Sequence, residues 1–259
     1  MLKIEALNQY ISYFKVPYKD IFVGIYILRH PDGAILFDAA GEDADVDDYI
    51  VPALVQLGIS AGELTHIFIS HNHKDHAGGL RRAHELFPNA VIVSGSAALK
   101  EQYPNVLPPT DGQLLTKDLQ IITVPGHSAD SAALLDLRTN TLVSGDCLQS
   151  YGIYGSGAWY GNVRLPKAHY EAIEKLRKYP IETVATAHDY HPCGMVSFGK
   201  QAVTERLDSC VAALERIREL IHANPDMDDE QIAERSNDGT LPRVAPHVVT
   251  ALRNMEEAL

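Results

Sequence analysis

The sequence is poor in cysteine and has no long hydrophobic run. Its 259 residues include only three cysteines, at irregular spacing, which is typical of reduced thiols and argues against a disulfide framework. No stretch reaches the roughly 18 uncharged apolar residues of a membrane-spanning helix, so we expect no membrane partner. Residues 1–5 lack the apolar segment of a signal peptide, and the expected location is therefore the cytoplasm.

Basic residues are also scarce. Lysine and arginine together number 22 against 34 acidic residues, which gives a formal charge of -12. Such a surface repels phosphate unless cations gather in one place, and the sequence holds no basic run, so the charge argues against nucleic acid as a partner. With 46% hydrophobic and 22% charged residues, the composition is that of a soluble globular protein with a sizeable core.

Short apolar runs alternate with amphipathic stretches over residues 1–198, which predicts an α/β body. From Gly199 onward the periodicity is helical and predicts a helical C-terminal extension, residues 199–259. The sequence leaves open whether these helices close a pocket or form the interface of a homodimer. The predicted strands are residues 21–28, 34–38, 65–70, 90–93, 119–124, 132–137, 141–144 and 183–187, and the predicted helices are residues 46–57, 79–86, 96–102, 167–178, 201–224, 226–235 and 244–257.

A dense group of metal-binding residue types directly follows the apolar run of residues 67–69. His71, His73, Asp75 and His76 lie within six residues, in the pattern H-x-H-x-D-H. At a strand end, residues two apart point the same way, so His71 and His73 can contact one ion while Asp75 and His76 reach a neighbouring ion. The glycines at 78 and 79 then allow the backbone to turn tightly into the next helix.

Four side chains would hold two ions incompletely, so we expect further ligands at other strand ends. His127 follows the predicted strand 119–124, Asp146 follows 141–144, and His188 follows 183–187. A lone histidine after a strand is more often a surface residue than a ligand. Next to the H-x-H-x-D-H motif, however, these three residues indicate a set of ligands for two ions.

In these motifs the sequence resembles the metallo-beta-lactamase superfamily, and the resemblance covers the ordered motifs from Asp38 to His188. It implies that residues 1–198 form a catalytic domain with a four-layer αβ/βα sandwich and a metal site at one edge of its two sheets. Asp38 looks like the early aspartate of the superfamily, which orients a ligand imidazole, and a turn or helix cap is the alternative role. The resemblance further implies one ion on His71, His73 and His127, a second ion on Asp75, His76 and His188, and Asp146 as the bridge.

The bridging aspartate and the gaps between motifs look most like the dinuclear, glyoxalase-II-like group, that is, proteins similar to hydroxyacylglutathione hydrolase. The gaps are 51 residues from His76 to His127, 19 to Asp146 and 42 to His188. The segment 147–151 stands where glutathione-thioester hydrolases typically have a Cys-Gly-basic sequence, and this departure argues against glutathione recognition.

A centre of this kind predicts a metal-dependent hydrolase. Two divalent ions that share a bridging water lower its pKa toward about 7 and so supply hydroxide, which attacks the carbonyl of a thioester, ester or lactone. Asp75 is expected to handle the proton. The ligands suit zinc, and manganese or iron is compatible. The alternatives are a phosphodiesterase or RNase-Z-like nuclease, a beta-lactam hydrolase and an iron-dependent persulfide dioxygenase.

A loop rich in aromatic residues and glycine follows Asp146. Residues 151–161 contain four aromatic residues and four glycines. Such a loop can form the wall of a pocket for a small-molecule substrate, or it can pin itself to the body or fill an interface. The candidate substrate-binding residues are Tyr151, Tyr154, Trp159, Tyr160 and, three residues beyond His188, His191.

Overall fold

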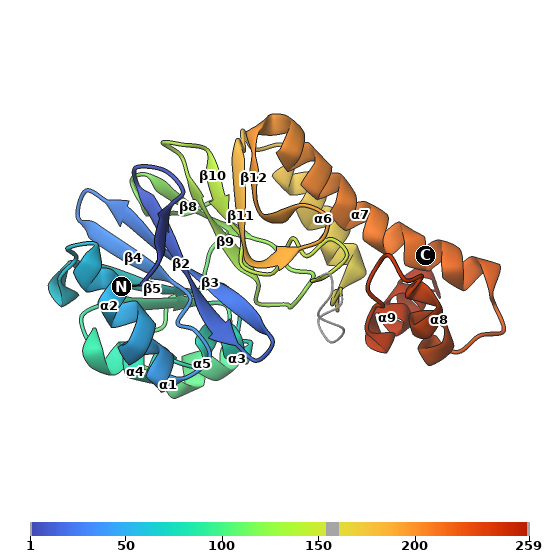
Figure 1. Cartoon of the computed structure of the whole chain (residues 1–259), viewed down its shortest axis with the longest axis horizontal. Helices are drawn as coiled ribbons and strands as arrows, with labels where there is room; N and C mark the ends of the chain where they lie inside the picture. The colour runs from blue at the N-terminus through green and yellow to red at the C-terminus, as the bar shows by residue number, and fades with distance from the viewer. Residues whose placement is uncertain (1, 154–160, 258–259) are drawn as a thin grey trace. The chain divides into compact units, whose positions relative to one another are not determined.

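The computed structural model describes residues 2–153 and 161–257, and the chain divides into two compact units. The first unit is Met1–Thr123 with Ala132–Thr139, and the second is Val124–Ser131 with Asn140–Leu259. Strands and helices alternate, and the strands form two mixed six-stranded sheets (Figure 1). The predicted α/β class is therefore confirmed.

In the first unit, six strands form a sheet in the order in which they occur in the chain. The pairing is antiparallel from β1 to β4 and parallel from β4 to β6. Because β4 and β5 run parallel, with Phe37 opposite Phe68, both strands end at the same edge of the sheet. The strands are β1 (Ile4–Ala6), β2 (Ile11–Tyr18), β3 (Ile21–His30), β4 (Gly33–Phe37), β5 (Leu64–Ile69) and β6 (Val91–Ser94).

The apolar runs of β3, β4 and β5 are buried almost completely, as continuous hydrophobic strands are when both faces are covered. Short helices connect the strands, and Figure 1 draws them in the blue-to-green part of the chain. They are α1 (Asp43–Asp45), η1 (Val46–Ile50), α2 (Val51–Gln56), η2 (Ala61–Glu63), α3 (Lys74–Ala77), α4 (Leu80–Leu86) and α5 (Ala97–Gln102). The first unit also holds three antiparallel strands, β7 (Leu114–Thr116), β8 (Leu119–Thr123) and β9 (Ala132–Asp136).

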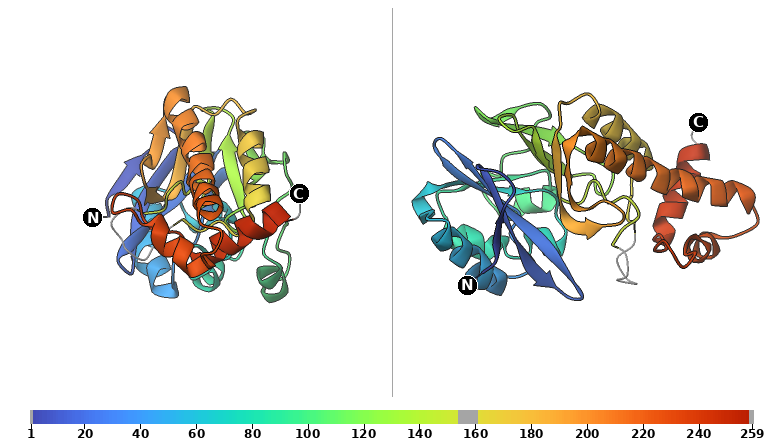
Figure 2. Two further views of the ribbon diagram at one scale, coloured as in Figure 1. Left: turned by 90° about the vertical axis from the view of Figure 1, so that its right-hand side faces the viewer. Right: turned by 45° about the horizontal axis from the view of Figure 1, so that its top comes forward.

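The second unit combines three strands with the C-terminal helices. β10 (Thr141–Val143) pairs parallel with β11 (Thr183–Tyr190), which pairs antiparallel with β12 (Gly194–Phe198). Figure 2 shows the long helix α7 (Gly199–Ala223) leading from β12 toward α8 (Asp229–Ser236) and α9 (Pro246–Glu257). A buried apolar cluster, which includes Val163, Ile217 and Val249, packs α7, α8 and α9 against the segment that precedes α6 (Pro166–Leu176).

All eight predicted strands are present, and residues 2–153 and 161–257 contain four others that the sequence analysis missed. The longest of these, β2, contains Pro17, which argues against a central strand because proline cannot donate a ladder hydrogen bond. β1 pairs only with Ser12 to Phe14, so Pro17 lies beyond the end of β1, where the proline removes no pairing with that strand. The predicted boundary between residues 198 and 199 coincides with the start of α7, and as a domain boundary it stays a prediction. None of the helices in the described ranges has the length and apolarity to cross a bilayer.

Candidate metal centre

His71 and His73 lie in the loop that follows β5. The His71 ring is buried, and its Nε2 lies 2.9 Å from Nδ1 of His73. Two ligands on one tetrahedral zinc ion are separated by roughly 3.3 Å, so these two nitrogens are close enough to share an ion. The hydroxyl of Ser70 lies 3.0 Å from the other ring nitrogen of His71, Nδ1, and so helps to fix the orientation of this ring.

Asp75 and His76 lie on α3, directly after His73, and both are buried. His76 Nε2 lies 3.5 Å from a carboxylate oxygen of Asp75. On the opposite side of the ring, His76 Nδ1 lies 2.7 Å from Oδ2 of Asp38. This second contact leaves Nε2 as the ring nitrogen that faces Asp75, which is the arrangement expected of a metal-binding histidine held by a carboxylate.

Asp38 reaches His76 because β4 and β5 end side by side. The backbone N–H of Ser70 donates to Asp38 Oδ1 at 2.7 Å, and the Ser70 hydroxyl donates to Oδ2 at 2.9 Å. Asp38 has a φ of 67°, a conformation that aspartate tolerates better than most residues. Burial raises the pKa of the Asp38 carboxyl, and its contacts with His76 and Ser70 oppose that rise.

Gly78 and Gly79 are needed for a different reason from the predicted tight turn. Their φ angles, -64° and -87°, are open to any residue. A side chain is excluded by close packing instead, because a Cβ at Gly78 would lie 1.9 Å from the carbonyl oxygen of Gly41 and one at Gly79 would lie 2.3 Å from that of Ala39. These contacts hold α3, with Asp75 and His76, against the loop that carries Asp38.

The second unit contains the other three predicted ligands, His127, Asp146 and His188, all buried. One carboxylate oxygen of Asp146, Oδ2, lies 3.8 Å from His127 Nε2, and the other, Oδ1, lies 3.4 Å from His188 Nε2. The two oxygens thus face different histidines. His188 lies inside β11 and not after it as predicted, at a place where the pairing register with β12 shifts.

The candidate substrate-binding residues are only partly described. The rings of Tyr151 and His191 lie 6.3 Å apart, and the Tyr151 N–H donates to the carbonyl of His191. The structure therefore places these two side by side in the second unit. Tyr154, Trp159 and Tyr160 lie outside the described residues.

Two residues that contact His127 were missed by the sequence analysis. Gln149 Nε2 and the carbonyl oxygen of Asn162 lie 2.8 Å and 2.7 Å from His127 Nδ1. Glutamine and asparagine are not typical ligands of zinc, so the residue types at positions 149 and 162 did not indicate a place in the metal centre. The position of Gln149, three residues after Asp146, was the only available signal.

His169 on α6 packs against the turn that carries His127. Gly126 has a φ of 157°, and a Cβ there would lie 2.8 Å from His169 Nδ1, so the turn and the ring are in close contact. Burial, and less strongly the neighbouring His127, lowers the pKa of His169 to about 4. The folded protein therefore holds this ring neutral.

This depressed pKa predicts a loss of stability in acid. Because the unfolded chain takes up the proton at an ordinary histidine pKa of about 6.5, the contribution of neutral His169 is complete above that pH and is lost as the pH falls toward 4, up to about 3 kcal/mol. Urea unfolding at about pH 7.5 and pH 5 should show a steeper loss for the wild type than for His169→Gln. Equal losses in the two proteins would contradict this assignment.

The described residues thus include clusters of histidine and aspartate, mostly buried, whose donor atoms could hold metal ions. Each unit, taken by itself, contains buried imidazole nitrogens and carboxylate oxygens. This donor set fits divalent ions such as zinc, manganese or iron, and it is consistent with a dinuclear site.

Curated relatives and solved structures resemble the chain over different lengths. It is 29% identical over 155 residues to the uncharacterized protein YobT of Bacillus subtilis, covering 50% of this chain and 64% of YobT. It is also 29% identical over 171 residues to a hydroxyacylglutathione hydrolase of Synechococcus sp. (strain JA-2-3B'a(2-13)), covering 64% of this chain and 63% of that protein. In both cases the chain spans slightly less than two thirds of the relative.

Solved structures share the fold at low sequence identity. A metallo-beta-lactamase family protein from Thermus thermophilus has a TM-score of 0.71 at 17% identity, with 98% of this chain and 95% of that chain covered. A metallo-beta-lactamase from Pontibacter korlensis has a TM-score of 0.62 at 19% identity, with 81% and 99% covered. The predicted metallo-beta-lactamase fold is therefore confirmed.

The sequence match extends across every predicted ligand. The family description of the metallo-beta-lactamase superfamily matches residues 20–188, which begin before Asp38 and end at His188. That range is well over half of the chain, and hydroxyacylglutathione hydrolases are distant homologues. The chain belongs to the metallo-beta-lactamase superfamily.

Proposed function

We propose that this protein is a dinuclear metal-dependent hydrolase that cleaves the carbonyl group of a thioester, ester or lactone. In this proposal His71, His73 and His127 would hold one ion, Asp75, His76 and His188 would hold the second, and Asp146 would be a ligand of both.

The geometry of Asp146 carries the proposal. Each of its carboxylate oxygens faces a different histidine, His127 at 3.8 Å and His188 at 3.4 Å. These separations are near the roughly 3.3 Å between two ligands of one zinc ion. A carboxylate that served a single ion would need only one oxygen directed at one histidine, so the arrangement supports two ions that share Asp146.

Two further observations in the first unit support the ligand roles. His71 and His73 approach each other through ring nitrogens, as ligands of one ion do. Asp38 Oδ2 lies 2.7 Å from His76 Nδ1. A neutral His76 ring with its proton on Nδ1 would donate to this carboxylate, and Nε2 would then face the ion. Asp38 is therefore assigned the role of orienting His76.

Two ions in this set would lower the pKa of water and polarise a carbonyl group, which is the chemistry that hydrolysis requires. The chain itself supplies the rest. Asp75 is an acid within 3.5 Å of His76 Nε2, 8% exposed, and it is placed to take up and return the proton. The buried ligand side chains limit the access of bulk water, which strengthens the electrostatic contacts around the reacting groups.

The distant homology supports the thioester among the carbonyl substrates. Hydroxyacylglutathione hydrolases are named for a glutathione thioester, and the match covers 63% of one such relative. Segment 147–151 of this chain lacks the Cys-Gly-basic sequence of glutathione-thioester hydrolases. We therefore propose a thioester or lactone without the glutathione moiety, bound beside Tyr151 and His191, and zinc as the metal.

Metal analysis and a substrate panel test the proposal together. Protein that has never been exposed to a chelator is expected to contain close to two divalent ions per chain and to hydrolyse a chromogenic thioester or lactone faster than a beta-lactam or bis-p-nitrophenyl phosphate. Activity should vanish on chelation and return with zinc. Much less than one ion per chain would overturn the metal centre, and a preference for the phosphodiester would replace the substrate class with phosphate diesters.

A further inference from the structure

We propose that Gln149 is a positioning residue that shifts the proton of His127 toward Nε2, and that the wild-type glutamine thereby weakens metal binding at this histidine. The proposal rests on the proposed role of His127 as a ligand.

The orientation of the Gln149 amide is set by a backbone group. The N–H of Asn162 donates to Gln149 Oε1 at 2.8 Å. A backbone N–H is always a donor, so the amide oxygen must face it and the amide nitrogen must point the other way. On that side, Gln149 Nε2 lies 2.8 Å from His127 Nδ1. The glutamine therefore presents a donor to the imidazole.

The carbonyl oxygen of Asn162 favours the opposite proton position on His127 Nδ1. It lies 2.7 Å from His127 Nδ1 and can only accept. A neutral imidazole has one proton, so Nδ1 either donates to Asn162 or accepts from Gln149. If Nδ1 donates, Nε2 keeps its lone pair and can bind an ion. If Nδ1 accepts, the proton is on Nε2, and this nitrogen cannot bind. The glutamine amide thus favours the ring form that is unable to hold metal.

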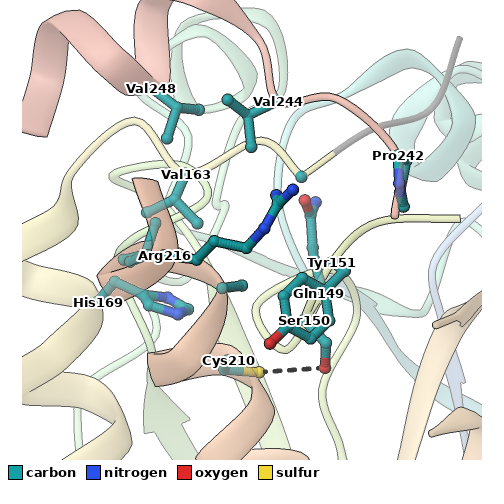
Figure 3. A pocket seen from close by; sticks show the side chains of 13 residues that line it. Gln149, Ser150, Tyr151, Val163, His169, Cys210, Arg216, Pro242, Val244 and Val248 are labelled. Carbon is teal, nitrogen blue, oxygen red and sulfur yellow. Dashed lines mark hydrogen bonds between the residues drawn. The ribbon is translucent and has the colours of Figure 1, made fainter. Parts of the chain in front are cut away.

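The surroundings keep both contacts in place. Gln149 is only 5% exposed, and it lines a small cavity with Tyr151, His169 and Val248, as Figure 3 shows. The cavity, about 20 Å³, has room for roughly one water molecule, so the amide has little space to turn away. On its other side, Asn162 is braced by α9, because its Oδ1 lies 2.6 Å from Nε2 of His247. The C-terminal helix is thereby coupled to the orientation of His127.

Gln149→Glu reverses the preference with almost no change of shape. One carboxylate oxygen still accepts from the Asn162 N–H, and the other replaces the donor with an acceptor for a proton on His127 Nδ1. Carboxylate partners of ligand histidines typically change metal affinity 10- to 100-fold. We expect the variant to bind zinc about 10-fold more tightly than the wild type in competition with a chromogenic chelator.

The proton position can be read directly in metal-free protein. In ¹⁵N spectra of histidine-labelled protein at about pH 8, His127 should carry a larger share of its proton on Nε2 in the wild type than in Gln149→Glu, where Nδ1 should be the main site. Gln149→Leu is the second variant, because a buried carboxylate can prevent folding. It removes the donor and should also shift the proton toward Nδ1. Gln201→Glu, an exposed change of the same charge on α7, is the control and should alter neither measurement.

The two proposals fail in different ways. If the wild type binds no zinc, the proposed function fails, and the ¹⁵N spectra alone then decide the role of Gln149. If zinc binds but the proton of His127 is distributed over its two nitrogens in the same ratio in the wild type and in the folded Gln149 variants, the inference is overturned. The inference is also overturned if Gln149→Glu folds normally and binds zinc no more tightly than the wild type.

Discussion

Replacing Asp146 by asparagine is expected to lower the rate of hydrolysis on the order of 10³-fold and to reduce the bound metal to one ion per chain or fewer. The substitution keeps the shape of the side chain but removes the charge and one of the two oxygens that face His127 and His188. Polarisation by a bound metal ion is worth several kcal/mol in the transition state, and each 1.4 kcal/mol is a factor of ten in rate.

A matched control lies close in the structure. Asp189→Asn makes the same chemical change one residue from His188, at an exposed side chain that is not among the proposed ligands. It should retain the metal content and nearly all of the activity. Both variants should melt as cooperatively as the metal-free wild type, as measured by circular dichroism. An Asp146→Asn protein that keeps two ions and full activity would eliminate Asp146 as the shared ligand.

The second large effect is expected on stability. Gly78→Ala should lower the free energy of unfolding by about 3 kcal/mol or more, because the new methyl group would lie 1.9 Å from the backbone oxygen of Gly41 and 2.5 Å from that of Lys74. Backbone atoms cannot move aside as a flexible side chain can. Helix propensity acts the other way. Gly78 is the C-cap of α3 with helical φ and ψ, so the preference of a helix interior for alanine over glycine, about 1 kcal/mol, is an upper limit on this gain. The sign of the result separates the two effects.

Gly62→Ala is the control for this experiment. Gly62 lies in η2, and a Cβ there has no neighbour within 4 Å, so the substitution should be neutral or slightly stabilising. Urea unfolding of metal-free protein measures both variants without interference from bound ions. A Gly78→Ala protein as stable as the wild type would show that the loop at Gly41 can withdraw. The close contact between Gly78 and Gly41 would then not be what fixes the position of Asp75 and His76.

The candidate ligands could be named from the sequence because their signal is local, and their role as ligands stays a prediction. The pattern H-x-H-x-D-H, and a histidine or aspartate near each of three further apolar runs, are features of residue type and short spacing. The strands beneath them were equally visible, since β4, β5 and β10 are short and mostly apolar. His188 was assigned to the wrong side of a strand end, because the polar residues from His188 onward hide the last part of β11.

The contacts around the candidate ligands could not be predicted from the sequence. Asp38 was as plausible for a turn cap as for a partner of His76, and only the parallel pairing of β4 with β5 places its carboxylate 2.7 Å from that ring. Gln149 and Asn162 carry no signal in their residue types, yet both contact His127. Gly78 was explained by backbone freedom, whereas the packing of α3 on Gly41 is what excludes a side chain.

By itself, then, the sequence determined the class of the fold, the family resemblance and the identity of the seven candidate ligands. Each of these depends on residue types within a few positions of one another. Tertiary structure alone decided which atoms of those ligands face one another and which neighbours orient them. The reason is that a hydrogen bond such as the one between Asp38 and His76 joins residues 38 positions apart. Its length depends on the pairing of β4 with β5 and on the packing of α3 against the loop that follows Asp38.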